Sequence, residues 1–367
     1  MEQNKNRRAA GRITAALFLL LLFGAAAAKL LLPDRAVSRA ERRKLAQKPA
    51  LSVSALQSGK FSDELEQYLL DQFPLREELR TAKAALRLFV FRQLDNDGIF
   101  LSDGAAYRMD DQLDEKQIAM TARKLTEIYE TYLQDSRVYY AAVPGKNNYL
   151  TDGRPKLDGE RLRTLLREQL PGLQEIELRD CLSAQDYYRT DLHWKQERIY
   201  SVAQRLAEAM GASLTPFSDY TERSLAPFYG AYYGQAALPL APDTLRYLCS
   251  AQTDAAVVEG LEFSGTRPVY DPARFSGLDG YDVYLSGAQA LLTVTLPDAQ
   301  TDRELILFRD SFGSSIAPYF LGAYRKITLI DLRYISASLL GDYVDFAGKD
   351  VLFLLSDGVI NRGSLLK

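Results

Sequence analysis

The chain has 367 residues, 47% apolar and 25% charged, which is enough for two domains or for one large domain with an appendage. Its 45 basic and 48 acidic residues give a net charge of −3, which argues against a nucleic-acid-binding protein. One histidine and two cysteines exclude a histidine-rich zinc site, a relay of several imidazoles and a disulfide scaffold.

The N-terminus combines a basic tail, residues 1–12, with an apolar segment. In the following stretch, Ile13–Leu32, Lys29 is the only charged residue. Twenty such residues can span a bilayer as a transmembrane helix, and the basic flank predicts a cytoplasmic N-terminus with the main domain outside the cell membrane. The alternative is a cleaved signal peptide, because residues 25–27 resemble a small-residue cleavage site. Both interpretations place the rest of the chain outside the cytoplasm.

Residues 33–97 are predicted to form a stalk followed by a helical collar. The segment Pro33–Ser58 is polar and mixed in charge, as expected for a stalk. Apolar residues recur at helical spacing through Phe61–Leu94. Pro74 interrupts this pattern, so that Arg76–Phe91 is predicted to form a second helix.

Residues 98–367 alternate between helical and strand patterns. Near-continuous apolar strands separated by helices are typical of an α/β domain with a doubly wound, mostly parallel sheet and helices on both faces. The predicted helices are 114–133, 159–169, 195–210, 313–321 and 337–346. The predicted strands are 138–143, 174–178, 304–308, 326–330 and 351–355, and 283–296 is rich in β-forming residues.

The first candidate for chemistry follows the apolar strand at 304–308. Asp310 and Ser311 lie there between a strand and a helix, and parallel α/β sheets bind ligands at the carboxyl ends of their strands. Backbone amides at the start of the helix favour a developing alkoxide or oxyanion. The alternative is that Asp310 or Ser311 only caps the helix. The spacing is not Gly-x-Ser-x-Gly, so the nucleophile elbow of α/β-hydrolases is absent.

The second candidate is the segment Thr190–Trp194, which contains the only histidine and the only tryptophan of the chain. If a serine is activated by a histidine, the base can only be His193. Asp191 can orient the imidazole if the backbone turns between the two residues, with Trp194 packed behind the ring. The alternative is a surface or core histidine with a neighbouring aspartate.

The order of these two segments resembles the permuted branch of the SGNH hydrolase superfamily, in which Asp-x-His-Trp precedes the serine. The chain is similar to the DHHW family of bacterial exported proteins, which are related to the SGNH-like domain of alginate O-acetyltransferases. Seven segments follow the family order across almost the whole exported chain. They are SRAERRKL (38–45), DQFPLR (71–76), VPGK (143–146), DLHW (191–194), FYGAYY (228–233), RDSF (309–312) and DLRY (331–334).

The resemblance implies a catalytic triad. Ser311 would attack an acyl carbonyl, His193 would take its proton and Asp191 would orient His193. Further candidates for binding the oxyanion or the substrate are Gly230, Gly287, Arg309, Arg333 and Tyr334. Of these, the two arginines could bind a carboxylate or a phosphate on the substrate.

Arg42 stands where the first segment usually has an asparagine, and two further departures concern the site. Leu192 stands where the family has the first of two histidines, although this is not the presumed base. Ala288 stands where relatives tend to have an asparagine. If that asparagine donates to the oxyanion, Gln289 or a backbone amide must replace it. Loss of one such donor typically lowers the rate about a hundredfold or more.

The resemblance implies an exported, membrane-anchored acyltransferase or esterase that acts on a cell-wall glycan or a secreted polysaccharide. O-acetyl transfer is the expected reaction, with a separate membrane protein as a candidate acyl donor. A serine mechanism needs no metal and no cofactor. The alternative, which the missing asparagine favours, is a non-catalytic wall-associated binding or scaffold protein with a degraded site. A simple esterase is a third hypothesis.

Overall fold

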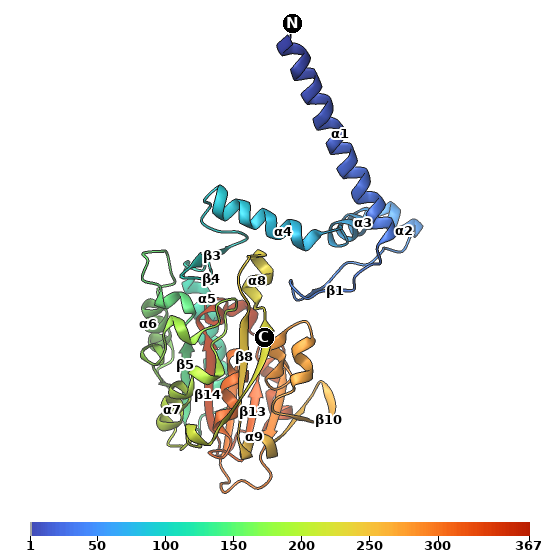
Figure 1. The fold of residues 1–367 in the computed structure, drawn as a ribbon. Coiled ribbons are helices and arrows are strands. Elements are labelled where there is room, and N and C mark those ends of the chain that lie inside the picture. Colours follow the sequence, from blue (N-terminus) through green and yellow to red (C-terminus); the bar gives the residue numbers. More distant parts are fainter. Residues whose placement is uncertain (1) are drawn as a thin grey trace. The chain divides into compact units, whose positions relative to one another are not determined.

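The computed structural model describes residues 2–367, with side chains from residue 11 onward, so that Met1 of the predicted tail lies outside the described residues. The chain divides into two compact units (Figure 1). The first comprises the residues up to Gln93 together with Ala237–Pro239. The second comprises Leu94–Ala236 and Leu240–Lys367.

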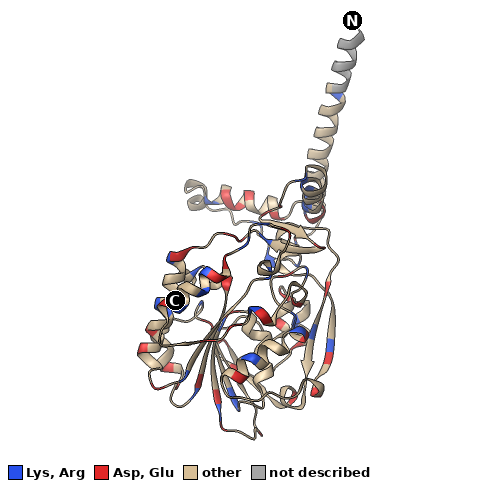
Figure 2. Cartoon of the chain, turned by 90° about the vertical axis from the view of Figure 1, so that its left-hand side faces the viewer, with Lys and Arg blue, Asp and Glu red and all other residues tan. Residues whose placement is uncertain are grey.

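The first unit begins with a single long helix, α1 (Glu2–Leu31), which joins the predicted tail and the predicted span. Its Gly11–Leu31 part is long and apolar enough to cross a membrane, and none of it is buried against the rest of the described chain. No charged residue interrupts it between Arg12 and Lys29 (Figure 2). Such a helix fits a membrane anchor or a signal sequence, whereas its exposure argues against a core helix of a soluble protein.

The segment predicted as a stalk contains local structure. A two-stranded hairpin joins β1 (Val37–Ser38) to β2 (Arg43–Lys44), and the helix α2 (Val53–Gln57) follows. The predicted pair of helices is then present as α3 (Lys60–Asp71) and α4 (Arg76–Ala85), with the break at Pro74. One π-helical turn, Leu86–Val90, continues α4.

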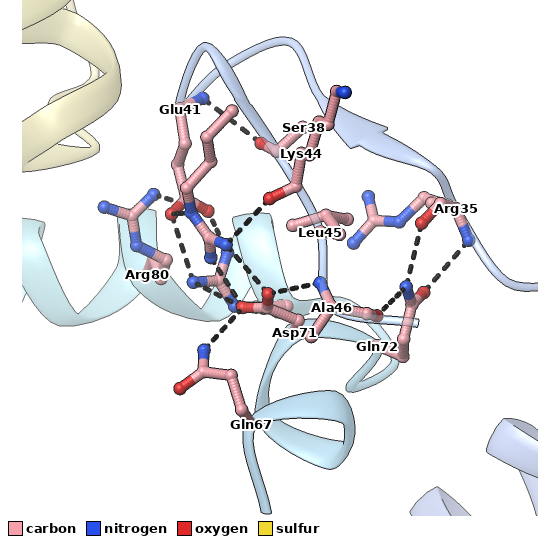
Figure 3. Close-up of polar contacts among 12 residues, drawn as sticks. Arg35, Ser38, Glu41, Lys44, Leu45, Ala46, Gln67, Asp71, Gln72 and Arg80 are labelled. Atoms are coloured by element: carbon pink, nitrogen blue, oxygen red, sulfur yellow. Dashed lines mark hydrogen bonds and ion pairs between the residues drawn. The ribbon is translucent and has the colours of Figure 1, made fainter. Parts of the chain in front are cut away.

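The hairpin is tied to helix α3 by Asp71, which is 1% exposed. Its carboxylate accepts hydrogen bonds from two nitrogens of Arg43, at 2.8 and 2.5 Å, and from the amide of Ala46 at 2.8 Å (Figure 3). The neighbouring Gln72 bonds the backbone of Arg35, accepting from its amide at 2.9 Å and donating to its carbonyl at 2.8 Å. Two of the family-like motifs therefore contact each other in the fold.

The second unit is built around an eight-stranded sheet (Figure 1). In chain order its strands are β5 (Val138–Val143), β6 (Gln174–Glu175), β9 (Val257–Gly260), β10 (Phe263–Pro268), β11 (Leu291–Thr295), β12 (Glu304–Arg309), β13 (Lys326–Ile330) and β14 (Asp350–Ser356). Their spatial order is β10-β9-β11-β13-β12-β14-β5-β6. The pairs from β13 to β6 are parallel, and those from β10 to β13 are antiparallel. The predicted mostly parallel sheet is confirmed, with an antiparallel edge.

Alternate side chains of the central strands enter two hydrophobic cores, one on each face of the sheet. In β12, Leu305 and Leu307 belong to one core, while Ile306 and Phe308 belong to the other, and all four are fully buried. The helices that contribute to these cores are α7 (Tyr200–Ala209) and α10 (Phe312–Ile316) on the first face, and α5 (Glu115–Tyr132) and α6 (Gly159–Gln169) on the second. Helices cover both faces, as predicted.

Several predicted elements are shorter in the structure. The region 195–210 starts with a 3-10 turn, Gln196–Arg198, before α7. The region 313–321 divides into α10 and a 3-10 helix because Pro318 lacks an amide donor. The region 337–346 holds a 3-10 turn, Ala337–Leu339, and the short helix α11 (Leu340–Tyr343).

Two hairpin-like pairs were not predicted from the sequence. One joins β3 (Ile99–Ser102) to β4 (Ala105–Arg108). The other pairs β7 (Thr221–Phe228) with β8 (Asp243–Cys249). The remaining short helices of this unit are α8 (Ala231–Ala236), α9 (Ala251–Ala255) and α12 (Asp357–Ile360).

Candidate active site

Ser311 lies at the carboxyl end of β12, between the neighbouring parallel strands β13 and β14. Its hydroxyl makes no capping hydrogen bond to helix α10. Asp310 performs that task, because one carboxylate oxygen accepts from the amide of Phe312 at 3.0 Å and the other accepts from the amide of Ser356 at 2.8 Å. The capping alternative therefore applies to Asp310, and the Ser311 hydroxyl is left for another partner.

That partner is His193, which lies 118 positions earlier in the chain. The distance between His193 Nε2 and Ser311 Oγ is 2.7 Å, and that between His193 Nδ1 and Asp191 Oδ1 is 2.6 Å. An ionised carboxylate can only accept, so Nδ1 carries the ring proton and Nε2 accepts from the serine hydroxyl. The structure therefore brings the three residues of the predicted triad into one hydrogen-bonded series. Asp191 is fully buried and His193 is 5% exposed.

The backbone of the Asp191 segment is fixed by partners from three other elements. Asp191 Oδ2 accepts from the amide of Ala231 at 2.6 Å. Thr190 Oγ1 donates to Asp243 at 2.7 Å and accepts from the amide of Gly230 at 2.9 Å. From the 3-10 helix Lys146–Tyr149, which follows β5, the buried Nζ of Lys146 donates to the carbonyl of Asp191 at 2.8 Å. These bonds fix the backbone of the segment that carries Asp191 and His193.

The imidazole is supported by an aromatic ring that sequence reasoning missed. Tyr281 stacks on His193 with ring centroids 4.0 Å apart and planes inclined by 10°. The expected packing of Trp194 behind the imidazole is wrong, because Trp194 packs edge-on against Phe312 at 5.2 Å. Trp194 Nε1 and the Tyr281 hydroxyl both donate to Ser315 Oγ at 2.8 Å. No spacing in the sequence linked Tyr281 to this site.

The backbone amides of the two candidate glycines, Gly230 and Gly287, already donate hydrogen bonds within the fold. The Gly230 amide already donates to Thr190 Oγ1, and an added Cβ there would lie 2.2 Å from the Thr190 carbonyl oxygen. The Gly287 amide donates to the carbonyl of Tyr284 at 3.0 Å, and its φ of +86° favours glycine. Since both amides are already bonded, neither is available as an oxyanion donor.

The segment that departs from the family pattern does not line the cavity around Ser311 in the described chain. Ala288 is exposed, and Gln289 Oε1 is buried without a hydrogen-bond partner. Leu192, the other departure, does line that cavity. The amide of Ser311 makes no hydrogen bond to a described residue, so it remains available as a hydrogen-bond donor.

Of the other three predicted substrate ligands, only Arg333 lines the cavity in the described chain. Arg309 is 1% exposed, lies 3.7 Å from Asp331 and does not line the cavity. Arg333 does line the cavity, but it donates two hydrogen bonds to Asp331, at 2.8 and 2.6 Å. Tyr334 is half exposed, with its ring centroid 5.5 Å from the Arg333 guanidinium, and lies outside the cavity lining.

A cavity of about 210 Å³ adjoins Ser311 at the carboxyl ends of β5, β12 and β14. Its buried ionisable lining residues include Lys146 and Asp357. Burial lowers the pKa of Lys146 to about 7 and raises the pKa of Asp357 to about 6. Asp357 accepts from Asn148 Nδ2 at 3.0 Å and from the amide of Gly145 at 3.4 Å. The cavity therefore combines a histidine-bonded hydroxyl with several groups that can bind a polar molecule.

Comparisons with known proteins agree on the fold. Residues 176–330 match the family model described as DHHW protein, a region that includes Asp191, His193 and Ser311. No curated protein matches the chain.

Several solved structures match the chain, all below 25% identity. A DHHW family protein from Eubacterium siraeum has a TM-score of 0.62 at 20% identity, covering 73% of this chain and 95% of its own. PatB1 of Bacillus cereus, solved with a sulfonyl adduct, has a TM-score of 0.58 at 16% identity, covering 73% of this chain and 98% of its own. PatB1 without the adduct gives 0.56 at 17% identity, covering 71% and 96%. The expected resemblance and the SGNH-like fold are confirmed.

Proposed function

The chain has an SGNH-like fold and a region that matches the DHHW family model, and from this we propose that the protein is an exported, serine-dependent O-acyltransferase or esterase. Acetyl is the proposed acyl group and a carbohydrate hydroxyl is the proposed acceptor. The observation that carries this proposal is the series Asp191–His193–Ser311, joined by hydrogen bonds of 2.6 and 2.7 Å beside a cavity.

The reaction proceeds in two steps. Ser311 Oγ attacks the carbonyl carbon of an acyl ester while its proton moves to His193 Nε2. The tetrahedral oxyanion accepts a hydrogen bond from the Ser311 amide, and His193 then protonates the departing alcohol as the acyl-serine forms. In the second step the acceptor hydroxyl attacks the acyl-serine and gives its proton to His193. Collapse of this second intermediate releases the new ester and returns that proton to Ser311.

Asp191 acts on the imidazole and touches no reacting atom. Its buried carboxylate fixes the Nδ1–H tautomer and stabilises the imidazolium that forms in both steps. Tyr281 limits rotation of the ring by stacking on it. The acyl donor enters through the cavity beside Ser311. The α1 helix would hold the domain at the outer face of the cell membrane, near nascent polysaccharide and a membrane-bound acyl donor.

The second candidate, a non-catalytic scaffold, is favoured by Ala288, where relatives tend to have an asparagine. Covalent labelling separates the two functions. PatB1 carries a sulfonyl adduct, which suggests phenylmethylsulfonyl fluoride as the probe. The full chain in nonionic detergent is expected to gain one adduct on the peptide that contains Ser311, detected by mass spectrometry. Ser311→Ala should abolish the adduct, His193→Gln should slow labelling at least a hundredfold, and the control Ser338→Ala should leave it unchanged.

An intact chain that stays unlabelled while it remains folded would support the scaffold instead. If Ser311 is labelled, p-nitrophenyl acetate as the acyl donor distinguishes an esterase from a transferase. An esterase releases acetate at a rate independent of added sugar, whereas a transferase yields an acetylated sugar in its presence.

A further inference from the structure

Four basic side chains line the cavity beside Ser311, and three of them are committed to partners. Lys146 donates to the carbonyls of residues 188, 189 and 191. Arg333 is held by its two hydrogen bonds to Asp331. Arg362 pairs with Asp110 at 3.4 Å, a long contact that leaves most of its donors unused.

Arg108, the fourth, has no partner for its guanidinium among the described residues. Its backbone is nevertheless well fixed. It is the last residue of β4, it pairs with Ile99 of β3, and its carbonyl accepts from Asn147 Nδ2. An uncommitted guanidinium on a fixed backbone is the kind of group that recognises a ligand with little loss of conformational freedom.

Arg108, Arg362 and Tyr232 all line the cavity. Burial raises the pKa of Tyr232, and the charges of both arginines oppose that rise. Three carboxyl groups also line the cavity, and each has a partner. Asp110 pairs with Arg362, Asp310 accepts from the amides of Phe312 and Ser356, and Asp357 accepts from Asn148 Nδ2. The Arg108 guanidinium is therefore left without a counter-ion among the described residues, which favours an anionic ligand.

We propose that Arg108, assisted by Arg362, binds an anionic oxygen group of the acyl acceptor, a carboxylate or a phosphate carried by the glycan. The inference rests on the proposed function and adds the substrate class: an acidic rather than a neutral polysaccharide. A guanidinium fork matches the paired oxygens of either anion. Arg108 is thus a residue for substrate specificity, with no part in the steps at Ser311.

The proposed anion binding by Arg108 can be tested by measuring ligand affinity in a protein that cannot form the acyl-serine. The full-length Ser311→Ala protein in nonionic detergent is titrated calorimetrically with three probes: cellotetraose, a β-1,4-linked glucuronate tetrasaccharide and phosphorylated cellotetraose. At least one acidic probe is expected to bind about tenfold or more tightly than cellotetraose, and high salt should erase the difference. Whichever acidic probe binds identifies the anion as carboxylate or phosphate.

The variants assign the preference to Arg108. Adding Arg108→Gln should remove the tenfold preference and leave cellotetraose binding unchanged, while Arg108→Lys should keep part of it. Arg137→Gln is the matched control, since Arg137 is exposed at the opposite, amino end of β5. Thermal unfolding checks that each variant is folded.

Equal affinity for neutral and acidic probes would overturn the inference, as would absent binding of both acidic probes or an acidic preference that survives Arg108→Gln. These results leave the labelling of Ser311 untouched, so the proposed function is judged separately.

Discussion

The ammonium of Lys146 donates a hydrogen bond of 2.8 Å to the main-chain carbonyl of Asp191. It also donates to the carbonyl of Tyr188 at 2.9 Å. The rings of Tyr107 and Tyr232 lie 4.9 and 5.0 Å from the same nitrogen. One buried lysine therefore ties the turn after β5 to the segment that carries Asp191 and His193.

Replacing this lysine is expected to disturb both stability and reactivity. Lys146→Met keeps the length of the side chain but leaves buried carbonyls unpaired, so the free energy of unfolding should fall by about 3 kcal/mol. Labelling of Ser311 should slow at least tenfold, because the imidazole loses its fixed position. Lys195→Met is the control, since the Lys195 side chain donates to the Gln185 carbonyl and to no other described residue, and it should cost about 1 kcal/mol or less. Equal effects of the two variants would contradict this role.

Gly230 should not tolerate a side chain. In Gly230→Ala the new Cβ would lie 2.2 Å from the Thr190 carbonyl oxygen and 2.4 Å from Asp191 Cβ, so the backbone must shift. We expect a loss of about 2–3 kcal/mol, measured by urea unfolding, and slower labelling of Ser311. The matched control is Gly358→Ala, where no atom lies within 4 Å of the new Cβ. A Gly230→Ala protein as stable as this control would refute the close approach.

The buried carboxyl of Asp357 predicts a specific pH dependence. Burial raises its pKa from 3.8 to about 6, so the folded chain keeps a proton that the unfolded chain releases first. Stability contributed by the neutral form is therefore full below pH 4 and declines as the pH rises to about 6. Asp357→Asn cannot ionise and avoids this decline, so it should be more stable than the parent by up to about 3 kcal/mol above pH 6.

Trp194 provides the measurement for Asp357→Asn. It is the only tryptophan and is fully buried, so its fluorescence reports unfolding of the second unit in urea. The stability difference between Asp357→Asn and the parent should vanish near pH 4. A difference that stays constant from pH 4 to pH 8 would rule out a raised pKa at Asp357.

In the first unit, Asp71 is expected to hold the hairpin. Asp71→Asn removes the charge that Arg43 pairs with and weakens the bonds to both guanidinium nitrogens. Trypsin should then cleave after residues 39, 42 or 43 several times faster than in the parent. Asp63→Asn, an exposed change on the same helix, is the control. Unchanged cleavage in Asp71→Asn would show that the hairpin is held by other contacts.

The orientation of the chain is tested in intact cells. If α1 anchors the chain with its N-terminus in the cytoplasm, external protease should digest the second unit in spheroplasts without lysis. Protection of that unit would reverse the proposed orientation. A mature N-terminus near residue 28 would identify the segment as a cleaved signal peptide. A cytoplasmic protein tested in parallel controls for lysis.

The sequence predicted the elements whose patterns are local. The strand at Leu305–Phe308 is a short apolar run between polar turns, and Pro74 marks a helix break whatever surrounds it. The antiparallel edge formed by β11 could not be predicted, because strand direction depends on pairing partners distant in the chain.

The same distinction applies to the site. With a single histidine in the chain, His193 was the only possible base, and its spacing to Asp191 is a local feature. Tyr281 and Lys146 act through tertiary contacts that leave no pattern near their own positions. Trp194 was misplaced for the same reason, since only the fold decides which ring reaches the imidazole.

His193 and Ser311 are 118 positions apart in the sequence, so they come together only when the chain folds. A newly made chain, or one being threaded across a membrane, contains Ser311 as an ordinary alcohol with no base nearby. In the proposed mechanism, the serine becomes reactive only when His193 Nε2 lies within hydrogen-bond distance of Ser311 Oγ, as it does in the folded chain. Folding would then be the step that activates the serine, and the unfolded chain should be inert toward acyl esters.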